Sequence, residues 1–167
     1  AEGALRILRA WHGRFAESAD PDQPLLAYVT RYLSDLDVDM KHGVPESMMR
    51  NIDSAVYSAS NIRDRFSPDG WLALNDLAKT ARRFHDTVRH GDDAAHAMTI
   101  LLRKLAGFAG LVHENMYRFT GWRFLSLGRY IERGLHMTRL LGHMSGPDAP
   151  DGALDMLLEI GDNVMTH

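Results

Sequence analysis

Apolar residues recur along this chain at intervals of three and four positions, and no stretch shows the alternation of apolar and polar residues typical of a β-strand. This periodicity is that of an α-helix with one buried face, and it continues from one end of the sequence to the other. The pattern therefore predicts an all-α fold.

Glycines, prolines and capping residues divide this helical pattern into seven segments. The clearest helix start is at Ser67, which can cap a helix whose first residue is Pro68. We expect Gly91 to end that helix, and Asp92 and Asp93 to cap the next one. The expected helices cover about residues 2–18, 24–36, 45–65, 68–89, 92 to beyond 111, 121–143, and 153 to the end. Because the connections are short, an antiparallel bundle of about seven helices is predicted.

Composition places the chain among single globular domains. It has 167 residues, 45% of them hydrophobic, and a net charge of -3, so there is no overall positive field to attract nucleic acid. The absence of cysteine excludes disulfides and thiolate zinc sites, and it is typical of a reducing compartment. No apolar run approaches the roughly 18 residues of a membrane helix. We therefore expect a cytoplasmic protein that binds neither nucleic acid nor membrane.

The expected helix over residues 121–143, GWRFLSLGRYIERGLHMTRLLGH, has two distinct faces. Successive residues of a helix are 100° apart, which assigns each side chain to one side. The predicted core side consists of Phe124, Leu127, Ile131, Leu135 and Thr138. The opposite side collects the charged residues Arg129, Glu132, Arg133 and His136.

This charged side has two open interpretations. Arg129 and Glu132 are spaced for a local ion pair, which would leave Arg133 free for an external carboxylate or phosphate. His136 adds a group that titrates near neutrality. The alternative is a solvated face, or an arginine and glutamate network that fixes the register of packed helices.

Further polar residues gather near expected helix ends. Several arginines at such positions could recognise an anion. These candidates are Arg63, Asn115, Arg118 and Arg123. For Arg65 and Arg118, compensation of the helix dipole and capping of carbonyl groups are the simpler explanation.

Familiar catalytic and metal-binding patterns are absent from the sequence. There is no pair of Glu-x-x-His motifs, no glycine-rich phosphate loop and no nucleophile elbow. Asp93 and His96 have a spacing that could serve a metal, but capping of a helix explains Asp93 more simply. We therefore expect neither a metal nor a cofactor. Nine methionines are interpreted as flexible filling of the core.

Three segments together carry a family resemblance. They are NIRDRFSPDGWLALNDL, LAGFAGLVHENMYRFTGWRF and the GWRFLSLGRYIERGLHMTRLL segment. With them the chain resembles the bacterial alpha-E domain family, a helical domain of unknown molecular function. Its motif residues correspond here to Arg129, Glu132 and Arg133, adjoined by Asn115, Arg118, Trp122 and Arg123.

The resemblance implies more than a fold. Family members carry a second Gly-Arg-Tyr-x-x-Glu-Arg segment near their N-terminus, and the residues AEGALRIL can be aligned with GLHMTRLL, as though the chain began just after that copy. We therefore expect residues 1–167 to be one helical domain that is a central fragment of a longer alpha-E domain. The resemblance also implies association with ATP-grasp proteins of the amide-ligase type and with transglutaminase-like proteins.

Three hypotheses for function follow. The leading one is a non-catalytic accessory domain that docks an ATP-grasp ligase or holds its acidic, peptide-like substrate. The second is an enzyme in which Glu132 acts as acid or base beside an arginine-lined anion site. The third is a purely structural arginine and glutamate network, in which case the fragment would expose apolar surface and self-associate.

Overall fold

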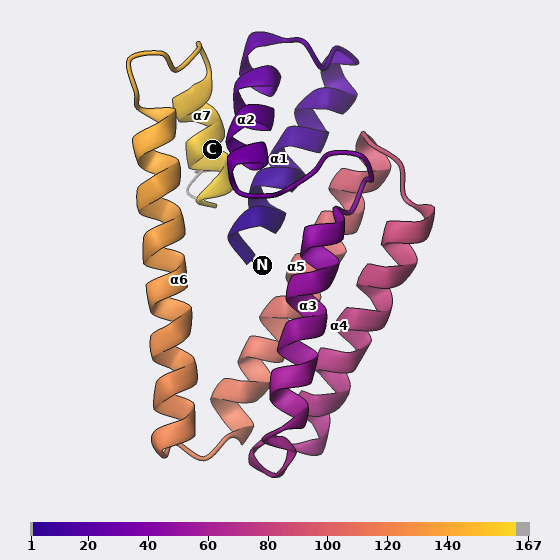
Figure 1. Cartoon of the computed structure of the whole chain (residues 1–167), viewed down its shortest axis with the longest axis vertical. Coiled ribbons are helices and arrows are strands. Elements are labelled where there is room, and N and C mark those ends of the chain that lie inside the picture. The colour runs from indigo at the N-terminus through magenta and orange to yellow at the C-terminus, as the bar shows by residue number, and fades with distance from the viewer. Residues whose placement is uncertain (1, 163–167) are drawn as a thin grey trace, which may run out of the picture.

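The computed structural model describes residues 2–162, which form seven α-helices and one short 3₁₀ turn, with no strand among them (Figure 1). The helices are α1 Glu2–Ser18, α2 Pro24–Asp35, α3 Glu46–Ser60, α4 Pro68–Thr87, α5 Asp92–Asn115, α6 Thr120–Met144 and α7 Ala153–Ile160. The 3₁₀ turn is Arg63–Arg65. The predicted all-α bundle of seven helices is confirmed.

Most helix boundaries follow the predicted signals, with two corrections. The Ser67 hydroxyl caps α4 by accepting a hydrogen bond from the Gly70 N–H at 3.0 Å. Gly91 does not end α4, which ends at Thr87. Gly91, whose φ of 99° suits glycine, is instead the N-cap of α5, and Asp92 and Asp93 lie in the first turn of that helix. The third helix ends at Ser60 because the chain tightens into the 3₁₀ turn.

The core is centred on α1, α4 and α5. α1 packs along α5, α4 packs on the same helix, and α3 lies against α4 (Figure 1). The apolar stripe of α1, which includes Leu5, Leu8 and Trp11, is buried. Trp11 Nε1 donates hydrogen bonds to the Leu26 carbonyl at 3.2 Å and the Thr30 hydroxyl at 3.0 Å. Several methionines fill this core as expected, among them Met48, Met98, Met144 and Met156.

Helix α6 lies at one edge of the molecule, and its orientation contradicts the sequence prediction. It packs mainly on α7 and α1, and its buried residues are Leu140 and Met144, near its C-terminal end (Figure 1). At the same end His143 stacks on Tyr28 and Tyr32 of α2. The predicted core side is instead exposed: Phe124 is 69% exposed and Ile131 52%. Leu127, Leu135 and Thr138 are exposed as well. The charged side faces α1 and α5 instead.

A physical reason for the reversal lies in the last turns of α6. Leu140 and Met144 lie close in angle to Arg129 and Arg133, and burying them turns the arginine side toward the body of the protein. Hydrophobic periodicity thus identified two faces correctly but assigned the wrong one to the core.

By length and composition alone, α5 could span a membrane. One such helix is weak evidence of membrane insertion. Arg103 and Lys104 lie in its middle, and α1 and α4 pack against it. These features favour a helix of the globular fold.

Candidate functional site

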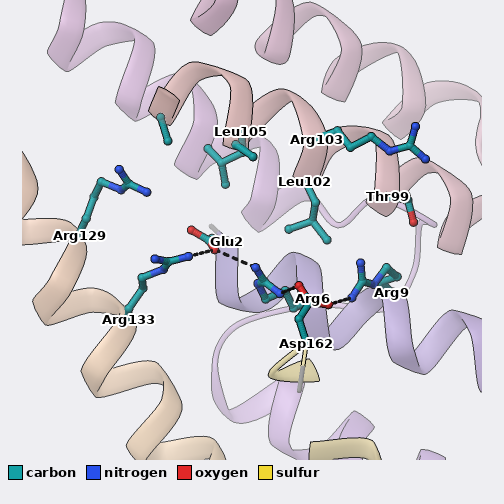
Figure 2. A pocket seen from close by; sticks show the side chains of 12 residues that line it. Glu2, Arg6, Arg9, Thr99, Leu102, Arg103, Leu105, Arg129, Arg133 and Asp162 are labelled. Atoms are coloured by element: carbon teal, nitrogen blue, oxygen red, sulfur yellow. Dashed lines mark hydrogen bonds and ion pairs between the residues drawn. The ribbon is translucent and has the colours of Figure 1, made fainter. Parts of the chain in front are cut away.

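Arginines from three helices meet at a cleft between α1, α5 and α6. The cleft has a volume of about 420 Å³ and an apolar wall on α5 that includes Leu102 and Leu105 (Figure 2). Its charged lining consists of Arg6, Arg9, Arg103, Arg129 and Arg133 against only Glu2 and Asp162. The balance of charge in the cleft is therefore positive.

Helix α1 supplies the side of the cleft that holds most of the ion pairs. Glu2, Arg6 and Arg9 are spaced by four and three residues, which places them on one helix face. Arg9 contacts the Asp162 carboxylate at 2.9 Å, and Arg6 contacts both Asp162 and Glu2, the latter at 3.3 Å. Asp162, just after α7, thereby ties the C-terminal part of the described chain to α1.

Arg133 joins α6 to α1 across the cleft. Its guanidinium donates to the Glu2 carboxylate at 2.5 Å, and the Glu2 side chain is only 19% exposed (Figure 2). Charge-assisted contacts of this kind are stronger than neutral hydrogen bonds. The predicted free guanidinium of Arg133 is thus engaged within the chain, while Arg129 has no ion-pair partner among residues 2–162.

These contacts set the charge of the carboxylates. Burial acts to raise the pKa of Glu2, but the guanidiniums of Arg133 and Arg6 outweigh it and hold the pKa below its usual value of 4.5. Hydrogen bonds from Arg6 and Arg9 likewise lower the pKa of Asp162, against a smaller effect of burial. Both groups are therefore ionised at neutral pH and offset part of the arginine charge.

Two arginines of the cleft have no carboxylate of the described chain paired with them. Arg103 on α5 and Arg129 on α6 make no hydrogen bond or ion pair with another residue in the described part of the chain. In Figure 2 they lie toward opposite ends of the cleft, with Leu102 and Leu105 between them. Guanidinium groups can bind a carboxylate or phosphate through two parallel hydrogen bonds, so both are available to an external anion.

A second hollow adjoins the first on the other side of Arg133. It has a volume of about 350 Å³ and is lined by both Glu132 and His136. The His136 ring lies directly against the backbone of Gly3, where an added Cβ would come within 2.1 Å of its Cδ2 atom. Burial lowers the pKa of His136, and the charge of Glu132 opposes that effect.

The structure brings Arg129, Glu132, Arg133 and His136 to these two hollows but leaves the other predicted residues outside them. Asn115 ends α5, and Arg118 and Arg123 flank the start of α6. The Arg118 guanidinium is stacked over Trp122, 5.5 Å from the ring centroid. Arg63 stacks over Trp71 at 5.0 Å. These residues belong to helix ends and cation–π contacts rather than to the cleft.

Sequence reasoning missed the α1 and α5 contributions to the cleft. The missed residues are Glu2, Arg6, Arg9, Arg103 and Asp162. The face shared by Glu2, Arg6 and Arg9 was visible in the sequence, whereas the positions of Arg103 and Asp162 depend on tertiary packing. Among residues 2–162, no group of three or more histidine, aspartate or glutamate side chains is arranged to hold a metal ion.

The protein is thus a helical domain whose Glu-Arg motif lies beside an arginine-lined cleft, and these two features define its class. The sequence model of the Alpha-E family, described as a predicted alpha-helical domain with a conserved ER motif, matches residues 1–167. The chain belongs to this family. Its one Glu-Arg dipeptide is Glu132–Arg133, so the motif coincides with the residues that join α6 to α1.

Longer mycobacterial proteins resemble the chain. It is 28% identical over 130 residues to the uncharacterized protein Rv2567 of Mycobacterium tuberculosis and to the uncharacterized protein Mb2597 of Mycobacterium bovis. Each match covers 75% of this chain but only 14% of the relative. No solved structure matches the chain significantly.

Proposed function

We propose that this chain is a non-catalytic accessory domain that holds an acidic, peptide-like substrate for an ATP-grasp protein of the amide-ligase type. The ligand lies in the cleft between α1, α5 and α6. The observation that carries the proposal is the arrangement of Arg103 and Arg129, two uncompensated guanidiniums on different helices with an apolar wall between them.

The charge distribution favours an extended acidic ligand over a single small anion. Glu2 and Arg9 are seven residues apart on α1, so the two ends of the cleft are separated by roughly 10 Å along that helix. An acidic peptide can place one carboxylate near Arg129 and another near Arg103. Its backbone and side-chain stems would then lie against Leu102 and Leu105.

The ligase partner is proposed from the family resemblance. Amide ligases act on carboxylates, so a domain that binds carboxylates suits the substrate side of that reaction. The matched region makes up only 14% of the mycobacterial relatives, which leaves room for a partner in the same polypeptide. A separate chain is the other arrangement, and a transglutaminase-like protein is a further partner of the same proposal.

A catalytic role for Glu132 is less well supported. Glu132 is exposed, and the acid or base of such a reaction works best in a partly buried site with a second catalytic group beside it. The neighbouring His136 is packed against Gly3 and is thereby held as a contact between α1 and α6.

A thermal-shift and calorimetric titration with tri-glutamate tests the binding proposal. We expect the peptide to raise the melting temperature of the native chain. Arg129→Ala and Arg103→Ala should each weaken binding roughly tenfold to 100-fold, because each removes a charge-assisted contact.

Arg31→Ala is the matched control, since Arg31 is an exposed arginine on α2 that does not line the cleft. It should leave the affinity unchanged. Binding that is lost equally in all three variants would indicate a response to net charge alone and would contradict the proposal. Absence of any tri-glutamate binding would also contradict it.

Co-expression with an ATP-grasp amide ligase of the same genome tests the partner. We expect the two proteins to co-purify when they are separate chains. The charge reversal Arg129→Glu should reduce recovery of the complex, because Arg129 makes no ion pair within the described chain and its loss leaves the fold intact. Undiminished co-purification would show that the cleft is not the surface that docks the ligase.

A further inference from the structure

The side of α6 that faces away from the body of the protein is apolar along most of its length. We name it the outer face of α6, and its large side chains are all at least half exposed. They are Phe124, Leu127, Tyr130, Ile131, Leu135 and Leu141. Between residues 124 and 141 the charged residues lie on the inner side or the flank of the helix, so this part of the outer face carries no charge.

The size of the outer face exceeds what a monomeric protein usually exposes. Residues 124–141 span roughly 26 Å of helix, and the exposed apolar side chains present on the order of 700 Å². The largest apolar patch of a typical monomer is ~300–600 Å², whereas each partner of a stable complex contributes about 800 Å². The outer face therefore has the area of one side of a protein interface.

The spacing along the outer face indicates what kind of partner covers it. Phe124, Leu127, Ile131, Gly134, Thr138 and Leu141 follow one another at alternating steps of three and four residues. This is the heptad spacing of a coiled-coil seam, in which one helix packs lengthwise on another. The occupant that this geometry requires is another α-helix.

The seam is complementary to itself when two copies run antiparallel. If the two-fold axis passes between residues 132 and 133 of the two helices, Ile131 of one copy faces Gly134 of the other. Leu127 of one copy then faces Thr138 of the other. Large side chains thus meet small ones, and the space beside Gly134 is open. A parallel pair would instead place Gly134 on Gly134 and leave a gap in the seam.

From this self-complementarity, the area and the absence of charge, we propose that two copies of the chain associate through the outer faces of α6 in an antiparallel pair with two-fold symmetry. The pairing covers the apolar side of α6. It leaves Arg129 and the cleft on the opposite side of each copy accessible.

Sedimentation velocity over a series of micromolar concentrations tests the association. We expect a monomer–dimer equilibrium. Leu127→Glu places a charge in the seam and should raise the dissociation constant roughly 100-fold or more. Leu72→Glu is the matched control, because Leu72 on α4 is also an exposed leucine, 64% exposed, and lies outside the seam.

The control should dimerise like the native chain, and circular dichroism should show equal helicity for both variants. A chain that is monomeric throughout would overturn the proposal, as would a dimer that Leu127→Glu does not weaken. In either case the outer face would have no role in pairing two copies.

A spin label tests the direction of pairing, and the chain is suited to it because it has no cysteine of its own. With Leu141→Cys labelled, the antiparallel pair predicts a separation of about 25 Å, since each label lies opposite residue 124 of the other copy. A separation of about 10 Å, that of adjacent helices, would overturn the antiparallel pairing.

Discussion

Helices α1 and α6 face one another across the cleft but are held in place in different ways. α1 has 17 residues and buries seven of them, from Gly3 to His12, mainly against α5, with α2, α7 and α6 covering the rest. α6 has 25 residues and buries only Leu140 and Met144. One wall of the cleft is thus part of the core, whereas the other is anchored near a single end.

This difference explains how the charged Glu132–Arg133 motif can face the body of the protein without being buried. The Glu132–Arg133 motif lies two turns before the buried anchor of α6, where Arg133 pairs with Glu2 and His136 lies against the backbone of Gly3. Arg133 and His136 therefore set the distance between the two walls. The N-terminal half of α6 should be the least protected helical segment of the described chain.

The largest expected difference is between two adjacent leucines of α6. Leu140 is fully buried and Leu141 is 50% exposed. Leu140→Ala should lower the free energy of unfolding by ~2–5 kcal/mol, and Leu141→Ala in the monomer by less than ~0.5 kcal/mol. Chemical denaturation at a concentration too low for self-association measures both. Equal effects would contradict the orientation of α6.

The core position of His12 on α1 predicts a dependence of stability on pH. Burial, aided by the charge of His90, lowers the pKa of His12 from 6.5 to about 4. The unfolded chain thus binds a proton below pH 6.5 that the folded chain does not bind until about pH 4. This contribution to stability is complete above pH 6.5 and decreases by up to about 3 kcal/mol as the pH falls to 4.

Denaturation series at several pH values measure this loss. His12→Asn should flatten the profile between pH 6.5 and 4, because the titrating group is gone. Below about pH 4.5, protonation of Glu2 and Asp162, whose pKa values are lowered, should remove further stability in native and variant chains alike. A profile that is as steep in the variant would show that another group is responsible.

A methyl group on Gly3 tests the contact between the two helices. The added Cβ would meet the His136 ring, so Gly3→Ala should lower the free energy of unfolding by ~1–3 kcal/mol. Gly13→Ala is the control on the same helix, because nothing lies within 4 Å of its Cβ position. Alanine favours a helix over glycine, so this control should be neutral or stabilising by up to ~1 kcal/mol.

The smallest expected effect is the coupling between Glu2 and Arg133. A double-mutant cycle with Glu2→Gln and Arg133→Met should give an interaction of about 0.5–1 kcal/mol, since the Arg133 side chain is 50% exposed. The same cycle with Arg129 in place of Arg133 should give less, because Arg129 is not paired with Glu2. Stronger coupling to Arg129 would reverse the assignment of the motif residues.

The sequence predicted the fold class and most helix boundaries because local signals determine them. Ser67 and Pro68 mark the start of α4, and the three-residue spacing of Leu5, Leu8 and Trp11 puts them on the buried side of α1. Asp92 and Asp93 were assigned to a cap because acidic residues suit both the cap and the first turn of a helix. Only the backbone of Gly91 distinguishes these positions.

The candidate site could be predicted only in part, because its other residues are brought together by tertiary packing. The charged group of α6 was identified, but periodicity carries no information on which side of a helix meets the rest of the chain. That choice depends on the burial of Leu140 and on the contact of His136 with Gly3. Gly3 lies near the other end of the sequence from His136, so local periodicity does not reveal this contact. Arg103 and Asp162 reach the cleft through the same tertiary packing.

The most direct test of the central claim is the thiol accessibility of neighbouring positions on α6. In a chain without native cysteine, single variants Leu140→Cys and Leu141→Cys report the inner and outer sides of the same turn. At a concentration below that of self-association, we predict rapid labelling at position 141 and slow labelling, limited by unfolding, at position 140. Rapid labelling at position 140 with protection at position 141 would show that the apolar side faces the core and would contradict the account.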